Sequence, residues 1–270
     1  MKIIKNISEL KRAIYKIKSL GFTPTMGGLH SGHISLIKES QKKCYKSIVS
    51  IYVNPSQFNN KKDFKNYPRK INQDLKILKK LNVNFVFLPK TNQIYKNKRY
   101  KKILLTKREK IMCAKYRKGH FEGVIDIMDR LTNIIKPNYV FLGEKDYQQI
   151  FLIKKYVNKK NPFKIISCKT IRDKNFVALS SRNLSLSKKK LLIASYIAKR
   201  LYNFKKQLIK NNKNVKDISF IKKELITKFK IKIDYLEIRN EKNLYLYKNK
   251  QKFRLFIAYY LKKIRLIDNF

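Results

Sequence analysis

The residues best suited to chemistry gather in short stretches beside expected strand ends. All three histidines and six of the seven glycines lie in such stretches. The first, Pro24-Thr25-Met26-Gly27-Gly28-Leu29-His30-Ser31-Gly32-His33, follows an expected strand and opens an expected helix. Glycines let the backbone approach a ligand closely, and free main-chain amides at a helix N-terminus attract phosphate. Two imidazoles three residues apart can donate hydrogen bonds to phosphate oxygens, so the stretch predicts a site for a phosphate-bearing ligand.

Three more polar stretches follow other expected strands. They are Asn54–Phe58, Gly143–Gln149, and Arg172 together with Leu179–Asn183. Ligands of open parallel sheets bind at the carboxyl ends of the strands, near the point where the strand order reverses. We therefore expect the four stretches to meet in one crevice that holds a nucleoside triphosphate.

The phosphate-binding glycine motifs of ordinary ATPases and of dinucleotide enzymes do not occur in the chain. The histidine stretch and the Ser-Ser-Arg stretch favour nucleotidyl transfer at the α-phosphate instead. Charge then builds on the leaving pyrophosphate, where it could be stabilised electrostatically by four side chains: His30, His33, Lys145 and Arg182.

Two simpler interpretations of the histidine stretch stay open. His30 and His33 could form half of a zinc site, although His120 is distant in sequence and the cysteines are scattered. The stretch could also be a plain turn with incidental histidines.

Composition excludes several classes of protein. The 270 residues carry a formal net charge of +49, yet 43% are hydrophobic, unlike a disordered basic tail. The lysines are spread along the chain, which favours a diffuse compositional excess over a dedicated polyanion site. Three scattered cysteines offer neither a disulfide framework nor a metal knuckle, and no secretory signal or membrane span occurs. We expect a cytoplasmic protein without a membrane partner.

Alternating short apolar runs and amphipathic stretches indicate β-α units around a parallel sheet. We expect strands at 22–25, 47–53, 84–88, 139–142 and 163–168, and helices at 32–43, 70–81, 123–135 and 147–157. Beyond Ser187 the pattern changes to two lysine-rich amphipathic segments, reaching 210 and 229, and strand-like runs at 231–238 and 253–260. The fold class is therefore α/β, with a doubly wound parallel sheet in residues 1–173 and a smaller α+β C-terminal domain in 174–270.

These motifs resemble a known family. Pro24–His33 is similar to the Pro-Thr-Met-Gly-Ala-Leu-His-x-Gly-His loop of the pantothenate synthetase (pantoate–β-alanine ligase) family. Six further segments resemble the remaining family motifs in order: Val53–Phe58, Asp63-Phe64 with Tyr67–Arg69, Gly119–Phe121 with Gly123-Val124, Gly143–Gln149, Leu179–Asn183 and Arg265–Asn269. The resemblance spans nearly the whole chain.

The resemblance implies a ligase with a Rossmann-like first domain that uses ATP and Mg²⁺ and usually forms a homodimer. Pantoate would attack the ATP α-phosphate to give pantoyl adenylate and pyrophosphate, and the amine of β-alanine would then displace AMP to give pantothenate. No protein ligand of the metal is implied. The alternative, a basic RNA-associated protein on a nucleotide-binding fold, depends on the charge alone, and we expect no specific nucleic-acid partner.

Site residues carry over by motif. The catalytic residues would be His33, in the catalytic-acid position, with His30 and Lys145. The ATP site would be lined by Met26, Gly27, Gly28, Leu29, His30, Ser31, Gly32, His33, Gly143, Glu144, Lys145, Asp146, Ile171, Leu179, Ser180, Ser181 and Arg182, the last four closing over the triphosphate. Gln57 and Gln149 would bind pantoate, and Gln57 would also lie near β-alanine.

Some positions depart from the family pattern. Gly28 stands where alanine is usual and Ser31 where glutamate is usual. Glu122 replaces a common arginine and Lys118 a proline. Lys262 replaces a glycine, which puts the left-handed backbone of that turn in question.

Overall fold

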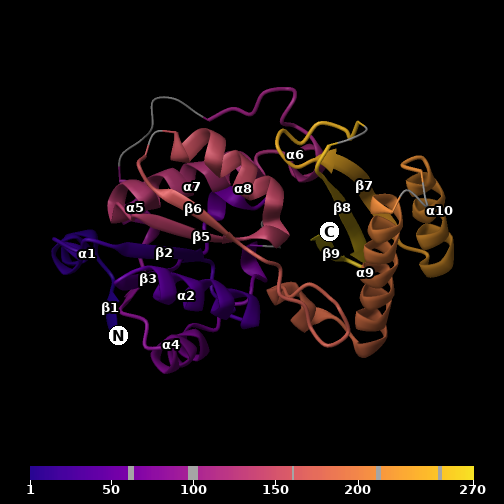
Figure 1. Cartoon of the computed structure of the whole chain (residues 1–270). Helices are drawn as coiled ribbons and strands as arrows, with labels where there is room; N and C mark the ends of the chain where they lie inside the picture. Colours follow the sequence, from indigo (N-terminus) through magenta and orange to yellow (C-terminus); the bar gives the residue numbers. More distant parts are fainter. Residues whose placement is uncertain (60–63, 97–102, 160, 211–213, 249–250) are drawn as a thin grey trace. The chain divides into compact units, whose positions relative to one another are not determined.

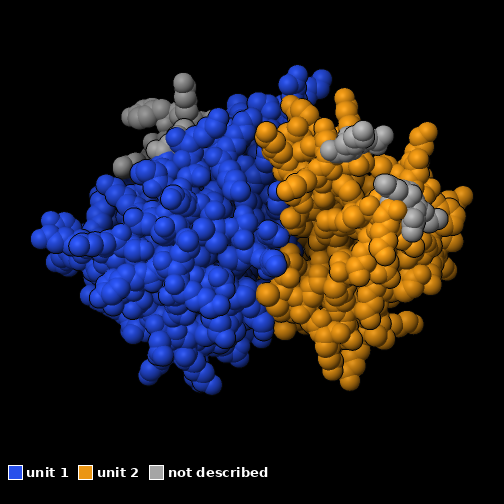
Figure 2. All heavy atoms as spheres, viewed as in Figure 1, with its two compact units in different colours: residues 1–169 blue, residues 170–270 orange. Residues whose placement is uncertain are grey.

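The computed structural model describes residues 1–59, 64–96, 103–159, 161–210, 214–248 and 251–270. It divides into two compact units, Met1–Lys169 and Thr170–Phe270 (Figure 2). The expected domain boundary, after Asp173, lies just inside the second unit.

The first unit is built on a six-stranded parallel sheet. Its strands are β1 (Lys2–Ile4), β2 (Leu20–Thr25), β3 (Lys46–Ile51), β4 (Phe85–Phe87), β5 (Tyr139–Gly143) and β6 (Lys164–Cys168). They lie in the order β1-β4-β3-β2-β5-β6, and each neighbouring pair is parallel. The central strands β2 and β3 are buried along almost their whole length, as strands covered on both faces must be.

Helices cover both faces of this sheet. The helical segments are α1 (Ile7–Ile14), α2 (Ser31–Lys43), η1 (Pro55–Gln57), α4 (Ile71–Lys80), α5 (Thr91–Ile94), α6 (Met112–Tyr116), α7 (His120–Ile135), η2 (Glu144–Asp146), α8 (Tyr147–Ile153) and η3 (Lys154–Asn158). Figure 1 shows α2 and α4 on one side of the sheet and α7 and α8 on the other. The predicted doubly wound α/β fold is confirmed.

The spacing of apolar residues in α7 predicts its buried face correctly. Val124, Ile127, Met128, Leu131 and Ile134 recur at helical intervals; the first four are buried and Ile134 is partly exposed. Because this face packs into the unit, the first turn of α7 is held at a fixed place beside η1.

The strand order reverses between β2 and β5. Strands β3 and β4 extend from β2 in one direction, whereas β6 extends from β5 in the other. The loops that leave the carboxyl ends of β2 and β5 therefore lead to helices on opposite faces of the sheet (Figure 1). Doubly wound sheets bind ligands at such a point.

The second unit has a smaller antiparallel sheet. Its elements are η4 (Ser181–Ser185), α9 (Lys188–Ile209), α10 (Asp217–Phe229), β7 (Lys232–Asn240), β8 (Phe253–Leu261) and β9 (Ile264–Asn269). The sheet has the order β7-β8-β9. One apolar cluster joins the helices to the sheet, with Leu201 and Phe204 from α9, Leu225 from α10, and Leu255 and Ile257 from β8. The predicted α+β character is confirmed.

Several elements are absent from the sequence-based description, among them β1, α1, β9 and the short helices α5 and α6. Strand β1 has three residues, too few for a recognisable alternation, and it pairs with β4 at the sheet edge. Helix α1 has eight residues. Strand β9 pairs with β8 after a tight turn in which Lys262 has a φ of +56°, so the left-handed conformation persists without glycine. No helix in the described ranges has both the length and the apolar character needed to cross a membrane.

Candidate functional site at the carboxyl edge of the sheet

The loop between β2 and α2 follows a left-handed path. Gly27 has a φ of +80° and Gly28 a φ of +64°, a region that residues with a β-carbon rarely occupy. Thr25, at the end of β2, donates its hydroxyl hydrogen to the Ser50 carbonyl at 2.8 Å and accepts the Gly27 amide at 3.2 Å. The paired glycines thus turn the chain at once from the strand toward the helix.

A buried carboxylate holds this loop from below. Asp74 of α4 is 2% exposed. Its two oxygens accept the main-chain amides of Gly28 at 2.9 Å and Leu29 at 2.8 Å. These two amides, which precede the helix N-terminus, are therefore occupied by a carboxylate of the protein itself.

Sequence reasoning did not select Asp74, although a signal existed. Asp74 and Leu78 are four residues apart on the same buried face of α4. An acidic side chain on an apolar helix face requires hydrogen-bond donors, since a buried carboxylate without partners is very costly. Its partners, however, lie in a loop 45 and 46 positions away in the chain.

His30 and His33 occupy the first turn of α2. His30 caps the helix: its Nδ1 accepts the Gly32 amide at 3.1 Å, while Nδ1 of His33 accepts the His30 amide at 3.3 Å. The ring centroids are 4.1 Å apart. A neutral imidazole that accepts at Nδ1 carries its hydrogen on Nε2, so both rings are arranged as Nε2–H donors.

The electrostatic environment keeps both rings neutral. Burial is the main reason that the pKa of His30 falls to about 4 and the pKa of His33 to about 3. Lys145 lowers both pKa values further, and Asp146 offsets part of that effect. Because β5 pairs directly with β2 in parallel, the loop after β5 leaves the same edge of the sheet as the loop after β2. Within the loop after β5, Lys145 Nζ lies 3.2 Å from an Asp146 oxygen.

A third loop joins them after β3. Asn54 is 1% exposed and caps η1 by accepting the Ser56 amide. Gln57, at the end of η1, is 7% exposed, and its side-chain amide contacts the Met26 sulfur. The stretches after β2, β3 and β5 therefore come together as predicted.

Two side chains around η1 were given no role from the sequence, although one of them, His120, belongs to a motif segment. The Tyr95 hydroxyl donates to Asn54 Oδ1 at 2.8 Å. His120 Nδ1 lies 2.7 Å from the Gln57 carbonyl oxygen. Asp63, part of the third motif segment, lies outside the described residues.

The adjacent glutamines of α8 have different environments. Gln148 is buried, and its amide is used in the structure: Oε1 accepts the Cys113 amide at 3.1 Å, and Nε2 donates to the Ile111 carbonyl at 2.8 Å. Gln149, the residue selected for pantoate, is partly exposed one position along the helix. Gln148 thus holds the backbone at Ile111 and Cys113 with its side-chain amide, whereas Gln149 is partly exposed.

The remaining ATP-site predictions belong to the second unit. Ile171 accepts the Leu179 amide through its carbonyl at 3.0 Å, and Ser180 caps η4 by accepting the Arg182 amide at 3.3 Å. These two hydrogen bonds fix the backbone of Leu179–Arg182 within the second unit. That these residues face the histidines of the first unit stays a prediction.

Arg172 belongs to a different arrangement from the one expected. Its guanidinium donates to the two Asp268 oxygens at 2.7 and 2.9 Å, and to the carbonyls of Phe176 and Asn269 at 3.1 Å each. These bonds join the start of the second unit to the end of the chain. Arg172 was grouped with the stretches expected to face phosphate, but in the structure its guanidinium is used in bonds within the second unit.

The zinc interpretation of the histidine stretch gains no support. Over the described ranges, no three histidine, cysteine, aspartate or glutamate side chains gather as ligands of a metal ion. The three cysteines are buried free thiols.

Comparisons with known proteins agree with the geometry. The family model described as pantoate-beta-alanine ligase matches residues 2–270. A pantothenate synthetase from Leptospira biflexa is 40% identical over 281 residues, covering 100% of this chain and 98% of the relative. The structure of a Francisella tularensis pantoate-beta-alanine ligase, described as a complex with beta-gamma ATP and beta-alanine, matches with a TM-score of 0.84 at 36% identity, covering 100% of this chain and 97% of that one. The structure of a Thermus thermophilus pantothenate synthetase matches with a TM-score of 0.92 at 28% identity, covering 100% and 99%.

Proposed function

The chain belongs to the pantoate-beta-alanine ligase family, and from this premise we propose that it joins pantoate to β-alanine through a pantoyl-adenylate intermediate. The observation that carries the proposal is the meeting of three loops at the strand-order reversal. Lys145 acts electrostatically on both His30 and His33, and Gln57 contacts Met26 of the histidine loop. Such an arrangement can hold a triphosphate and a small acid next to each other.

In the first step, a pantoate carboxylate oxygen attacks the ATP α-phosphorus. The new bond joins that oxygen to phosphorus, and the bond to the β-phosphate oxygen breaks to release pyrophosphate. His30 and His33 would donate from Nε2 to phosphate oxygens, and Lys145 would supply positive charge. Since both rings are neutral, they act as hydrogen-bond donors, and the catalytic-acid role expected for His33 is replaced in this proposal by donation without proton transfer.

The triphosphate would be enclosed by residues from several segments. Met26–His33 and Gly143–Asp146 of the first unit are the proposed lining. From the family resemblance alone, Ile171 and Leu179–Arg182 of the second unit are proposed ATP-binding residues. Enclosure would exclude water, which otherwise hydrolyses the adenylate.

In the second step, the neutral amine of β-alanine attacks the activated carbonyl. A carbon–nitrogen bond forms, the bond from carbon to the AMP oxygen breaks, and the amine loses a proton to solvent. Gln57 and Gln149 would hold pantoate, because an amide offers both donors and an acceptor to its hydroxyls and carboxylate without the repulsion of a second acid. Holding the amine against the adenylate can contribute about 7–11 kcal/mol.

We further propose that Mg²⁺ arrives with ATP. Mg²⁺ binds phosphates together with one or two carboxylates and waters, and Asp146 is the carboxylate whose field reaches both histidines. The ion would neutralise phosphate charge. From the family resemblance we also propose a homodimer, and the free thiols suit a cytoplasmic location.

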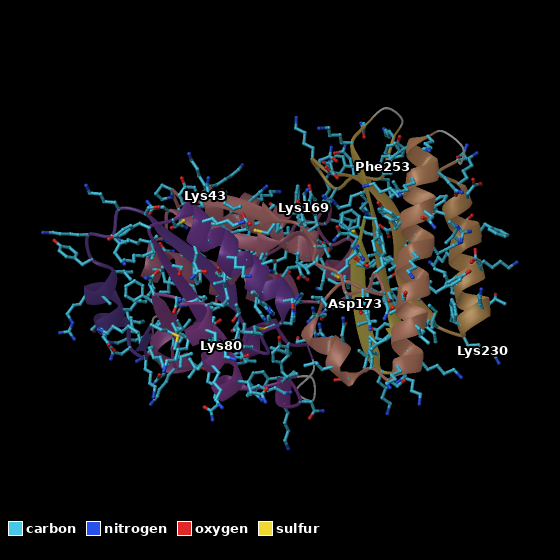
Figure 3. The ribbon with its side chains drawn as sticks, turned by 60° about the horizontal axis from the view of Figure 1, so that its bottom comes forward. Lys43, Lys80, Lys169, Asp173, Lys230 and Phe253 are labelled. Atoms are coloured by element: carbon cyan, nitrogen blue, oxygen red, sulfur yellow. The ribbon has the colours of Figure 1, made fainter. Side chains whose placement is uncertain are left out.

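The RNA-associated alternative receives no support from the family or the relatives. Exposed lysines occur on both units, for example Lys43 and Lys80 in the first and Lys230 in the second (Figure 3). The charge is thus distributed, as a compositional excess would be.

The decisive experiment supplies ATP, pantoate and β-alanine and follows pyrophosphate, AMP and pantothenate. We expect pyrophosphate release to require pantoate, and pantothenate to require all three substrates. His33→Ala should lower the rate of pantoate-dependent pyrophosphate release by roughly 10²–10³ because one donor to the developing charge is lost. Lys38→Ala, an exposed change on the same helix, should leave that rate unchanged. Pyrophosphate release without pantoate would contradict the proposal.

A further inference from the structure

We infer that His120 is a positioning residue: it fixes the main chain of Gln57, and the Gln57 side chain then holds pantoate. The inference depends on the proposed role of Gln57 and adds a residue that touches no substrate. Its basis is a directed hydrogen bond between two buried residues from different elements.

The neighbours of His120 determine which nitrogen carries the hydrogen. Nη1 of Arg117 lies 2.8 Å from His120 Nε2, and a guanidinium can donate but not accept. Nε2 therefore accepts, and the hydrogen of the neutral ring is on Nδ1. His120 Nδ1–H then donates to the Gln57 carbonyl oxygen at 2.7 Å. Arg117 thus selects the tautomer that can hold Gln57.

The same helix turn also holds the beginning of η1. Asn54 Nδ2 donates to the Gly123 carbonyl at 3.1 Å. A β-carbon at Gly123 would lie 2.4 Å from the Ser56 carbonyl oxygen, so the two backbones are in close contact. The first turn of α7 therefore fixes Asn54 through a hydrogen bond, Ser56 through close packing, and Gln57 through His120.

Burial makes this bond consequential. His120 is 9% exposed and Gln57 is 7% exposed. Without His120, the Gln57 carbonyl would lose a partner in a place with little access to water, and the backbone would shift to find another. The Gln57 side chain, which contacts Met26, would move with it. A displacement of about 1 Å in a binding group can cost about 10²-fold in rate.

The test exploits the different reach of two amide side chains. Asparagine places its Nδ2 near the position of histidine Nδ1, whereas glutamine places its amide near Nε2. We expect His120→Ala to raise the KM for pantoate about 10–100-fold with the KM for ATP changed less than about twofold. His120→Asn should recover most of the pantoate affinity, and His120→Gln should recover little.

Matched controls separate positioning from general damage. Glu122→Gln alters the same turn of α7, where an acidic residue favours the helix N-terminus, and it should leave both KM values near wild type. Thermal unfolding of every variant reports folding. An equal rise in the KM for ATP and pantoate in folded His120→Ala, or recovery by glutamine but not asparagine, would overturn the inference.

A double-mutant cycle distinguishes this inference from the proposed function. Gln57→Ala alone should weaken pantoate binding, and His120→Ala added to it should cost little more, because the positioned side chain is gone. If Gln57→Ala does not affect pantoate, the proposed role of Gln57 fails. If Gln57→Ala has a large effect but the two changes act independently, the positioning role of His120 fails while that of Gln57 stands. Should His120→Ala not fold, the asparagine and glutamine variants decide the matter.

Discussion

At the scale of single residues, the histidine pair is defined by its hydrogen bonds to the helix backbone. Each Nδ1 accepts a main-chain amide in the first turn of α2. Protonation would put a hydrogen on that acceptor and break the cap, and burial disfavours the cation as well. The fold therefore selects one protonation state and one tautomer for both rings.

This selection has a measurable pH dependence. In ¹⁵N-histidine NMR spectra we expect His30 and His33 to show neutral Nε2–H tautomers from pH 8 to pH 5, because their pKa values lie at about 4 and about 3. Folding lowers both values below the usual 6.5. The stability that depends on the neutral rings is thus complete above pH 6.5, and it is lost as the pH falls from 6.5 to about 4 for His30 and to about 3 for His33. A titration midpoint near 6.5 for either ring would contradict this description.

Asp74 provides a second prediction at this scale. Asp74→Asn replaces one of two acceptors by an NH₂ group that faces the Gly28 or Leu29 amide. We expect the free energy of unfolding to fall by about 1–3 kcal/mol, because a buried donor loses its partner. The KM for ATP should rise about tenfold, equivalent to about 1.4 kcal/mol, since the histidine loop loosens. Urea titration measures the change in stability and steady-state kinetics the change in KM, with the exposed Glu39→Gln variant as control. An unchanged KM for ATP would show that Asp74 does not position the histidine loop for ATP.

At the scale of elements, periodicity predicts what is long and regular. The spacing in 123–135 indicates α7, and the β-branched runs indicate β2, β3 and β5, because burial of one face or both faces leaves a repeated pattern. Strand β1 and helix α1 are too short for such a pattern. Supporting residues such as Asp74 and His120 could not be assigned, because their partners are distant in the chain and are set by packing.

The turn between β8 and β9 has a strained backbone at Lys262, where the family pattern has glycine. Lys262 has a φ of +56°, and a residue with a β-carbon pays about 1 kcal/mol or more for this conformation. We expect Lys262→Gly to raise the thermal midpoint of unfolding by a few degrees. Lys263→Gly, at the neighbouring position of the same turn, should not raise it. A lower midpoint for Lys262→Gly would show that the lysine side chain contributes more than the backbone strain removes.

At the scale of the whole molecule, the sequence predicts the two kinds of architecture and most of the loops that bring the site together. The meeting of the loops after β2, β3 and β5 follows from parallel strands sharing one edge. The residues expected from the second unit, Ile171 and Leu179–Arg182, form a local structure of their own. Their approach to ATP depends on the placement of one unit on the other, which no local pattern encodes.

The second unit has an internal tie between its first and last residues. Arg172 joins the segment leading to Leu179 to the last residues of the chain through Asp268, and its guanidinium also lies 4.6 Å from the centroid of Phe176 and 4.5 Å from that of Phe270. Arg172 and Asp268 are 15% and 8% exposed. The end of the chain therefore holds the beginning of the second unit in place.

Breaking this tie should affect the whole second unit. We expect Asp268→Ala to lower the free energy of unfolding by about 3–5 kcal/mol, because it leaves Arg172 buried without its anion. Combining it with Arg172→Met should restore part of that loss, since no unpaired charge then stays buried, although the Phe176 and Asn269 carbonyls lose a donor. Urea unfolding of the single and double variants measures both effects. A double variant no more stable than Asp268→Ala would show that Arg172 acts chiefly through those carbonyls and the aromatic rings rather than through its ion pair.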